Sequence, residues 1–272
     1  MRVGFIGLGS QGGPMARRIV EGGYETTLWA RRAASLEPYA DTAAKTAGSP
    51  AELAAASDLV CLCVVGDDDV REVLYGETGV LAGLASGGIV AIHSTVHPDT
   101  CREIAERAAA QRVSVIDAPV SGGAPAVEEG KLLVMVGGDE DVIERCRPVF
   151  AIYADPIVHL GPLGSGQVTK ILNNLLFTAN LGSALSTLDL GESLGIPRVR
   201  LAEVLNGGSA TSKALGSIAI FGGTVDGLAP IAGALLQKDV RHAANIAANA
   251  SAPEGSVFSA ADTALKSMDH PR

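Results

Sequence analysis

Short apolar runs alternate with amphipathic stretches along the first part of the chain. The runs have the length of buried strands, and the stretches between them place apolar residues at helical spacing. Because strands separated by helices form βαβ units, we expect a mainly parallel sheet with right-handed crossovers. The predicted strands are residues 3–6, 26–29, 59–65, 89–92, 113–116 and 132–136, and the predicted helices are 14–21, 51–56, 69–75 and 98–111.

The pattern changes at a cluster of glycine and proline at 161–166, beyond which no strand pattern follows. Apolar residues then recur at helical spacing over 167–194, a long helix for a globular protein. Further helices are expected around 198–205, 211–220 and 235–250, and residues 268–272 are expected to fray. We therefore expect an α/β protein. It would have an N-terminal Rossmann-like doubly wound sheet over 1–162 and a C-terminal all-helical domain over 163–272, which begins with a long interdomain helix.

Composition and charge narrow the possible partners. The chain has 272 residues, of which 47% are hydrophobic and 19% charged, so disorder is excluded as the dominant state. The net charge of −9 argues against a nucleic-acid partner, and no apolar stretch approaches the roughly 18 residues of a membrane span. The four cysteines form no Cys-x-x-Cys pair, which indicates free thiols in a reducing cytoplasm. No histidine or cysteine cluster has metal-ligand spacing, so we expect no metal.

The first expected strand runs into a Gly-x-Gly-x-x-Gly loop that opens a helix. Gly7 permits a tight turn, Gly9 lets the backbone approach a pyrophosphate, and Gly12 allows close packing of helix against strand. Ser10 and Gln11 complete the loop before the helix, whose N-terminus offers free N–H groups to phosphates. We interpret the loop as a dinucleotide-binding loop, with a plain turn as the alternative.

The end of the second strand indicates which dinucleotide binds. An NAD enzyme would carry an acidic residue near Ala30 to hold the ribose 2′-hydroxyl, and none is present. Arg31 and Arg32 follow instead, and guanidinium groups pair with phosphate. The sequence therefore predicts NADP, with Arg31 as the first candidate for the phosphate and Arg32 as the second. NAD is possible, and two solvated surface arginines are the alternative.

Three further segments have distinctive sequences. Residues 117–123 read Asp-Ala-Pro-Val-Ser-Gly-Gly, residues 164–174 read Gly-Ser-Gly-Gln-Val-Thr-Lys-Ile-Leu-Asn-Asn, and Lys238 precedes Asp239. Together with the glycine loop, they resemble the β-hydroxyacid dehydrogenase family, 3-hydroxyisobutyrate dehydrogenase-like proteins of the 6-phosphogluconate dehydrogenase superfamily. The resemblance implies an NAD(P)-dependent oxidoreductase that assembles as a homodimer or homotetramer through its helical domains.

Lys170 and Asn174 are the candidate catalytic residues. They lie four apart in a predicted helix and so share one face. A lysine beside an apolar pocket can act as general acid or base, because desolvation lowers its pKa. Asn174 can hold the substrate or the lysine without competing as a base. The alternative for Lys170 is a solvated surface lysine, and the resemblance favours catalysis.

The candidate substrate site is an anion-binding loop. Ser121, Gly122 and Gly123 follow a strand, and successive N–H groups with a hydroxyl can bind a carboxylate. The alternative is a loop whose glycines only satisfy the backbone. Lys238 supplies a positive charge for the carboxylate or the cofactor, with Asp239 to orient it, or the two form a surface ion pair.

The resemblance also assigns cofactor contacts to Val64 and Val65, at the end of the predicted strand 59–65, and to Thr95, after the predicted strand 89–92. We expect the enzyme to interconvert a small 3-hydroxy carboxylate and the corresponding aldehyde acid. Two alternatives remain open at this point. One is an imine reductase on the same fold, which usually carries Asp or Tyr where Lys170 stands. The other is an NADP-binding sensor without catalysis.

Overall fold

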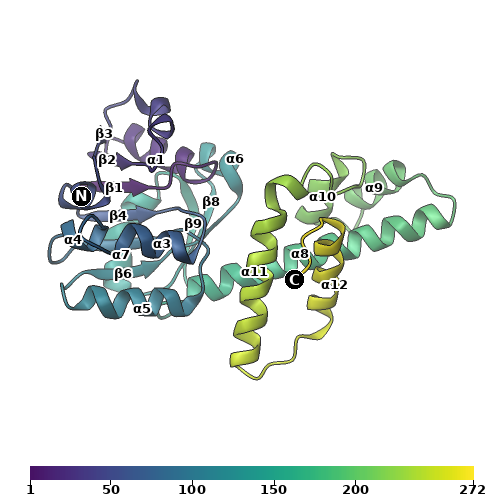
Figure 1. The fold of residues 1–272 in the computed structure, drawn as a ribbon. Helices are drawn as coiled ribbons and strands as arrows, with labels where there is room; N and C mark the ends of the chain where they lie inside the picture. The colour runs from purple at the N-terminus through teal and green to yellow at the C-terminus, as the bar shows by residue number, and fades with distance from the viewer. The chain divides into compact units, whose positions relative to one another are not determined.

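The computed structural model describes residues 1–272, which divide into two compact units, Met1–Lys170 and Ile171–Arg272. All the strands lie in the first unit, and the second is entirely helical (Figure 1). The predicted fold class, a Rossmann-like sheet followed by a helical region, is confirmed.

The first unit is organised around a six-stranded parallel sheet. Its strand order, β3-β2-β1-β4-β5-β6, is that of a doubly wound dinucleotide-binding sheet. The inner strands β1, β4 and β5 are buried along their whole length because helices cover both faces. The strands are β1 Val3–Ile6, β2 Thr26–Trp29, β3 Lys45–Thr46, β4 Leu59–Leu62, β5 Ile89–Ile92 and β6 Ser114–Asp117.

A second, three-stranded sheet was not anticipated as a separate element. It contains β7 Val120–Ser121, β8 Leu132–Val136 and β9 Ala154–His159, with β7 antiparallel and β9 parallel to β8. An isolated bridge between Asp117 and Gly137 connects β6 to this sheet. Strand β9 was missed because it is an edge strand with Pro156 inside it and a largely exposed pattern.

The connections between strands form seven α-helices and two short 3₁₀ turns. Local capping explains several boundaries. The Ser49 hydroxyl accepts the Glu52 N–H at the start of α2, and the Asp139 carboxylate accepts the Asp141 and Val142 N–H groups at the start of α7. The helices are α1 Gly12–Glu21, α2 Pro50–Ala55, α3 Asp67–Leu74, α4 Val80–Gly83, α5 Pro98–Ala109, α6 Gly123–Glu128 and α7 Glu140–Phe150.

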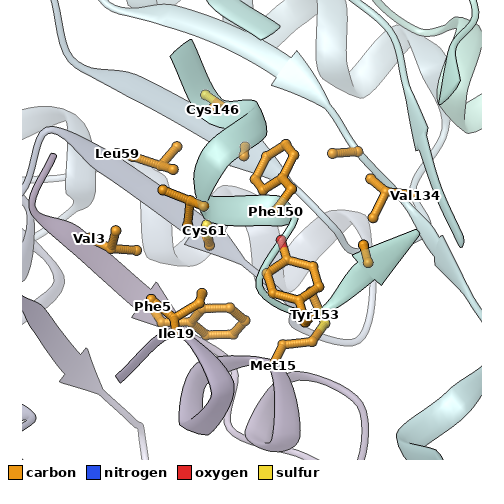
Figure 2. Packing of buried hydrophobic residues seen from close by; sticks show 14 of the residues in the cluster. Val3, Phe5, Met15, Ile19, Leu59, Cys61, Val134, Cys146, Phe150 and Tyr153 are labelled. Atoms are coloured by element: carbon orange, nitrogen blue, oxygen red, sulfur yellow. The ribbon is translucent and has the colours of Figure 1, made fainter. Parts of the chain in front are cut away.

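Apolar side chains pack on both faces of the sheet. One cluster joins the sheet to α1, α7 and β8, and the other joins it to α2, α3, α4 and α5. Figure 2 shows the first cluster, in which Phe5 and Met15 approach Phe150 and Tyr153. His93 is buried among these rings, and its Nδ1 donates to the Ala118 carbonyl oxygen at 2.7 Å. Burial lowers the pKa of His93 to about 4.

The second unit consists of α9 Arg198–Gly207, α10 Lys213–Ala219, α11 Ala229–Asn249, α12 Gly255–Ser267 and most of α8 Ser165–Ser193. The long helix α8 confirms the predicted one, whereas α11 begins earlier than expected and α12 was not predicted. None of these or the other helices is long and apolar enough to cross a membrane.

The expectation of a frayed tail was wrong. Met268 is buried in the helical core, and the Arg272 guanidinium pairs with Glu254 at 2.8 Å and Asp262 at 3.0 Å. The Gln237 side-chain amide also donates to the Pro271 carbonyl oxygen.

Glycine allows two pairs of helices to approach each other closely. A Cβ atom added to Gly83 of α4 would lie 1.9 Å from the Ala51 carbonyl oxygen of α2. A Cβ added to Gly182 of α8 would lie 1.9 Å from the Ala260 carbonyl oxygen of α12. No side chain fits at either crossing.

Candidate active site

The glycine loop lies at the carboxyl end of β1 and is shaped by tight backbone packing. Gly7 has a φ of +100°, and a Cβ there would lie 2.2 Å from the Cys63 carbonyl oxygen. Gly12 packs against the Gly7 carbonyl oxygen, whereas the space around Gly9 is open. Helix α1 has no side-chain cap and no acidic residue in its first turn, so its positive end is unscreened. This geometry suits an approaching pyrophosphate.

Ser10 and Gln11 flank the start of α1 in different ways. Ser10 is exposed, and Gln11 is half-buried, with its side-chain amide 3.6 Å from the Met15 sulfur. The loop therefore presents one hydroxyl at the surface beside Gly9.

The two arginines after β2 have different surroundings. The Arg31 guanidinium lies 3.1 Å from an Asp69 carboxylate oxygen and 2.9 Å from Glu72, both on α3. No ion pair holds Arg32, which is exposed at the start of a 3₁₀ turn. A phosphate would have to compete with two carboxylates for Arg31 but not for Arg32.

Hydrogen bonds bring the loops after β4 and β5 together. The Val64 N–H donates to the Ser94 hydroxyl at 2.8 Å, so Val64 and Thr95 lie on loops that are linked directly. Val65 is exposed at the same edge. The Gln167 side chain spans Thr95, accepting from the Val96 N–H at 3.1 Å and donating to the Ser94 carbonyl oxygen at 2.8 Å.

The segment 117–123 has two parts with different surroundings. Asp117 is fully buried, and its carboxylate accepts the N–H groups of Gly164 and Gln167, each at 2.7 Å. Desolvation raises the pKa of Asp117, while these N–H donors oppose the shift. Gly122 and Gly123 both have positive φ, where α6 begins, and Ser121 precedes them on β7.

A buried carboxylate joins two of the predicted site residues in the second unit. The Asn174 side-chain amide donates to Asp239 Oδ2 at 2.5 Å, and Lys238 Nζ lies 3.2 Å from Asp239 Oδ1. Asp239 is only 3% exposed. Asn174 and Lys238 thus meet through Asp239. Lys170 precedes Asn174 by one turn of α8 and belongs to the first unit.

The sequence pattern gave Gln167 no role, and it did not reveal the hydrogen bonds of Ser94 or the contact between Asp239 and Asn174. Gln167 stands inside the segment 164–174, and Ser94 stands next to Thr95, so their positions were a signal. Their partners are backbone groups far away in the chain, which no local pattern reveals.

The structure has no group of three or more potential metal ligands. The four cysteines are free. Burial raises the pKa of the Cys63 and Cys146 thiols to about 12. These thiols are therefore protonated near neutral pH and poorly suited to nucleophilic chemistry.

Two family profiles together match almost the whole chain. The NAD binding domain of 6-phosphogluconate dehydrogenase matches residues 2–161, and the NAD-binding domain of NADP-dependent 3-hydroxyisobutyrate dehydrogenase matches residues 164–269.

Individual relatives agree with the profiles. An uncharacterized oxidoreductase of Shewanella frigidimarina is 36% identical over 78% of this chain and 73% of its own length. A probable 3-hydroxyisobutyrate dehydrogenase-like protein of Arabidopsis thaliana is 35% identical over 79% and 67%. The solved structure of Mycobacterium tuberculosis 3-hydroxyisobutyrate dehydrogenase with L-serine is 27% identical, with a TM-score of 0.84, over 100% and 96%.

Two more solved structures share the fold. Psf3 in complex with NADP⁺ and 2-OPP is 25% identical, with a TM-score of 0.83, over 98% of this chain and 93% of that one. A Streptomyces aurantiacus imine reductase is 19% identical, with a TM-score of 0.69, over 99% and 98%, which shows a shared fold.

The doubly wound sheet, the glycine loop and the profile matches define the chain as an oxidoreductase that uses a nicotinamide dinucleotide. The matches over both units narrow this class. The chain belongs to the β-hydroxyacid dehydrogenase family, whose members include 3-hydroxyisobutyrate dehydrogenases.

Proposed function

We propose that the enzyme is NADP-dependent and interconverts a small 3-hydroxy carboxylate and the corresponding aldehyde acid, with Lys170 as the general acid or base. The observation that carries the proposal is the start of α8. Lys170 lies one turn before Asn174, on a helix whose first turn is hydrogen bonded to the loop that bears Thr95.

In the oxidative direction the substrate loses a hydride from its carbinol carbon and a proton from its hydroxyl group. Bound NADP⁺ would supply the acceptor for this hydride. Lys170 Nζ, in its neutral form, accepts the hydroxyl proton, and the carbonyl product forms. In the reductive direction the protonated Lys170 donates that proton to the carbonyl oxygen. Asn174, held by Asp239, orients the reacting hydroxyl without acting as a base.

The substrate carboxylate has two proposed partners. Ser121, Gly122 and Gly123 offer N–H groups and a hydroxyl, and Lys238 offers a positive charge. Because Asp239 shares the charge of Lys238, the lysine contributes a directed donor more than a free cation.

The choice of NADP over NAD rests on Arg31 and Arg32 and on the absence of an acid at Ala30. Gly7, Gly9, Ser10, Gln11 and Gly12 would bind the pyrophosphate, and Val64, Val65 and Thr95 the nicotinamide half. The solved structure of Psf3, which is 25% identical to this chain, contains NADP⁺ and supports the same choice.

We further propose a cytoplasmic homodimer or homotetramer joined through the helical unit. Leu172, Leu176 and Leu190 of α8 are each more than half exposed, and an oligomer would bury such residues. The free cysteines suit a reducing compartment.

The decisive experiment is a turnover screen of small 3-hydroxy acids, aldehyde acids and cyclic imines, each with NADP(H) and NAD(H). We expect turnover of a hydroxy acid or aldehyde acid, preference for NADP(H), and at least a 100-fold loss of kcat in Lys170→Met. Lys213→Met, at the start of α10 and not among the proposed site residues, serves as a matched control.

Each of the other outcomes of this screen points to a different function. Turnover of imines alone would favour an imine reductase, and NADP binding without any turnover would favour a sensor. A rate near that of the wild type in Lys170→Met would remove the lysine from the mechanism. Light scattering on the same preparation would refute the oligomer if it gave the mass of one chain.

A further inference from the structure

We propose that Gln167 is a positioning residue that fixes the loop bearing Thr95 to the helix bearing Lys170. This inference rests on the proposed function, because it assigns Gln167 a role in that reaction. Gln167 would act by holding Thr95 and Lys170 in place, and it would touch neither substrate nor nicotinamide.

The contacts of Gln167 require an amide. Its Oε1 accepts the Val96 N–H, and its Nε2 donates to the Ser94 carbonyl oxygen, so one side chain binds the backbone on both sides of Thr95. Gln167 is fully buried, and no water can replace either bond. A side chain with only a donor or only an acceptor leaves one buried backbone group unsatisfied.

The backbone of Gln167 is fixed as firmly as its side chain. Asp117 Oδ2 accepts the Gln167 N–H, and Asp117 Oδ1 accepts the Gly164 N–H, so the first turn of α8 is bound to the carboxyl end of β6. Gly166 completes the fit, because a Cβ there would lie 2.4 Å from the Met135 carbonyl oxygen of β8. The start of α8 can therefore shift little relative to the sheet.

The consequence concerns the distance between two proposed functional groups. Lys170 follows Gln167 by three residues, less than one turn of the same helix. Thr95 is held between the two residues that Gln167 binds. Because Gln167 is bound at both its backbone and its side chain, it sets the spacing between the proton-transfer residue and the loop on the nicotinamide side.

The first test compares wild type with Gln167→Met, which has nearly the same volume and neither hydrogen bond. We expect kcat to fall about 10- to 100-fold, with a smaller change in KM for the substrate, because the reacting groups are misaligned. The same substitution combined with Thr95→Val should be non-additive in kcat/KM. Ser57→Ala, which removes the buried bond to the Leu53 carbonyl oxygen, is the control for lost stability alone.

A second variant keeps the test valid if Gln167→Met folds poorly. In Gln167→Glu the neutral carboxyl group can reproduce both bonds, whereas the carboxylate loses the donor to the Ser94 carbonyl oxygen. We expect kcat relative to wild type to rise as pH falls from 8 to 6. Wild-type kcat in Gln167→Met, or a flat ratio in Gln167→Glu together with additive effects, would overturn the proposal.

One readout does not depend on the substrate. Amide hydrogen exchange at Val96 should be faster in Gln167→Met than in wild type, while exchange in Ser57→Ala should be unchanged there. If wild type turns over nothing in the screen, the proposed function fails. The exchange rate at Val96 still shows whether Gln167 holds the loop that bears Thr95. Unchanged exchange at Val96 in Gln167→Met would show that Gln167 does not fix this loop, whatever the enzyme's substrate.

Discussion

Arg31 and Arg32 show what a sequence can and cannot say of single residues. The sequence makes Arg31 the first candidate for the phosphate and Arg32 the second, whereas the structure pairs Arg31 with Asp69 and Glu72 on α3. Those carboxylates lie 38 and 41 positions further along the chain. No local pattern links residues so far apart, so the sequence could not reveal that carboxylates already hold Arg31, its first candidate.

The cofactor preference gives a prediction at this scale. We expect Arg32→Ala and Arg31→Ala each to lower kcat/KM for NADPH, with NADH little affected, and the double variant to lose about 10-fold or more of the preference. Arg32→Ala should have the larger effect, because Arg31 is shared with two carboxylates. Steady-state kinetics with both cofactors measures this.

Arg147→Ala provides the control, because Arg147 lies on α7, pairs with Glu144 there and is not among the proposed cofactor-binding residues. Equal losses with NADPH and NADH in the Arg32 variant would show that the arginine does not read the 2′-phosphate.

At the scale of elements, helices and strands with regular apolar spacing could be predicted from the sequence. Those with an internal proline or few large apolar side chains could not. The inner strands and α8 follow clear patterns and were predicted within a few residues, apart from the end of β4, which stops at Leu62. Helix α7 was missed although Asp139 caps it, because Pro148 lies inside it. Helix α12 was missed in an alanine-rich region, where few large side chains mark the buried face.

The contact between α8 and α11 yields a prediction of its own. Asp239→Leu removes the buried acceptor of the Asn174 amide and the ion-pair partner of Lys238, so we expect kcat to fall about 10- to 100-fold. Asp239→Asn keeps one acceptor oxygen and should lose less. Kinetics at saturating cofactor, with KM for the substrate measured separately, tests the order of the two variants.

Asp226→Leu is a matched control, because Asp226 is an exposed acceptor for the Thr224 hydroxyl in the same unit. If Asp239→Leu changed thermal stability but left kcat intact, the buried carboxylate would have only a structural role.

For the whole molecule, the fold class could be predicted because the pattern of apolar residues stays regular within each unit and changes once between them. Strand and helix signals alternate up to the glycine-rich cluster, and helical spacing continues beyond it. The candidate site could be proposed from the sequence wherever a compact motif marks it, such as the glycine loop. The links between motifs, made by Ser94, Gln167 and Asp239, depend on tertiary contacts and appear only in the structure.

The buried histidine predicts how the stability of the first unit depends on pH. The pKa of His93 is about 4 in the folded state, against 6.5 for an ordinary histidine, so the unfolded chain binds a proton more readily. The contribution of His93 to the free energy of unfolding is therefore fully present above the unfolded-state pKa of 6.5, and it is lost as the pH falls toward 4. Between pH 7 and 4.5 the loss from His93 is about 2–3 kcal/mol.

Denaturant unfolding at the two pH values measures this loss, and the single tryptophan, Trp29 on β2, reports on the first unit. His93→Asn retains a donor near the position of Nδ1 and cannot be protonated, so it should lack this part of the pH dependence. The same pH dependence in both proteins would mean that other groups cause it.

The glycine-mediated crossings at Gly83 and Gly182 have a consequence for how this enzyme tolerates mutation. Each is remote in sequence from the glycine loop, yet even alanine would collide with a carbonyl oxygen there. Random mutagenesis would thus inactivate the protein through its scaffold as well as through its chemistry. A map of intolerant positions would therefore overstate the extent of the active site, and would have to be corrected for packing before it could be used to locate function.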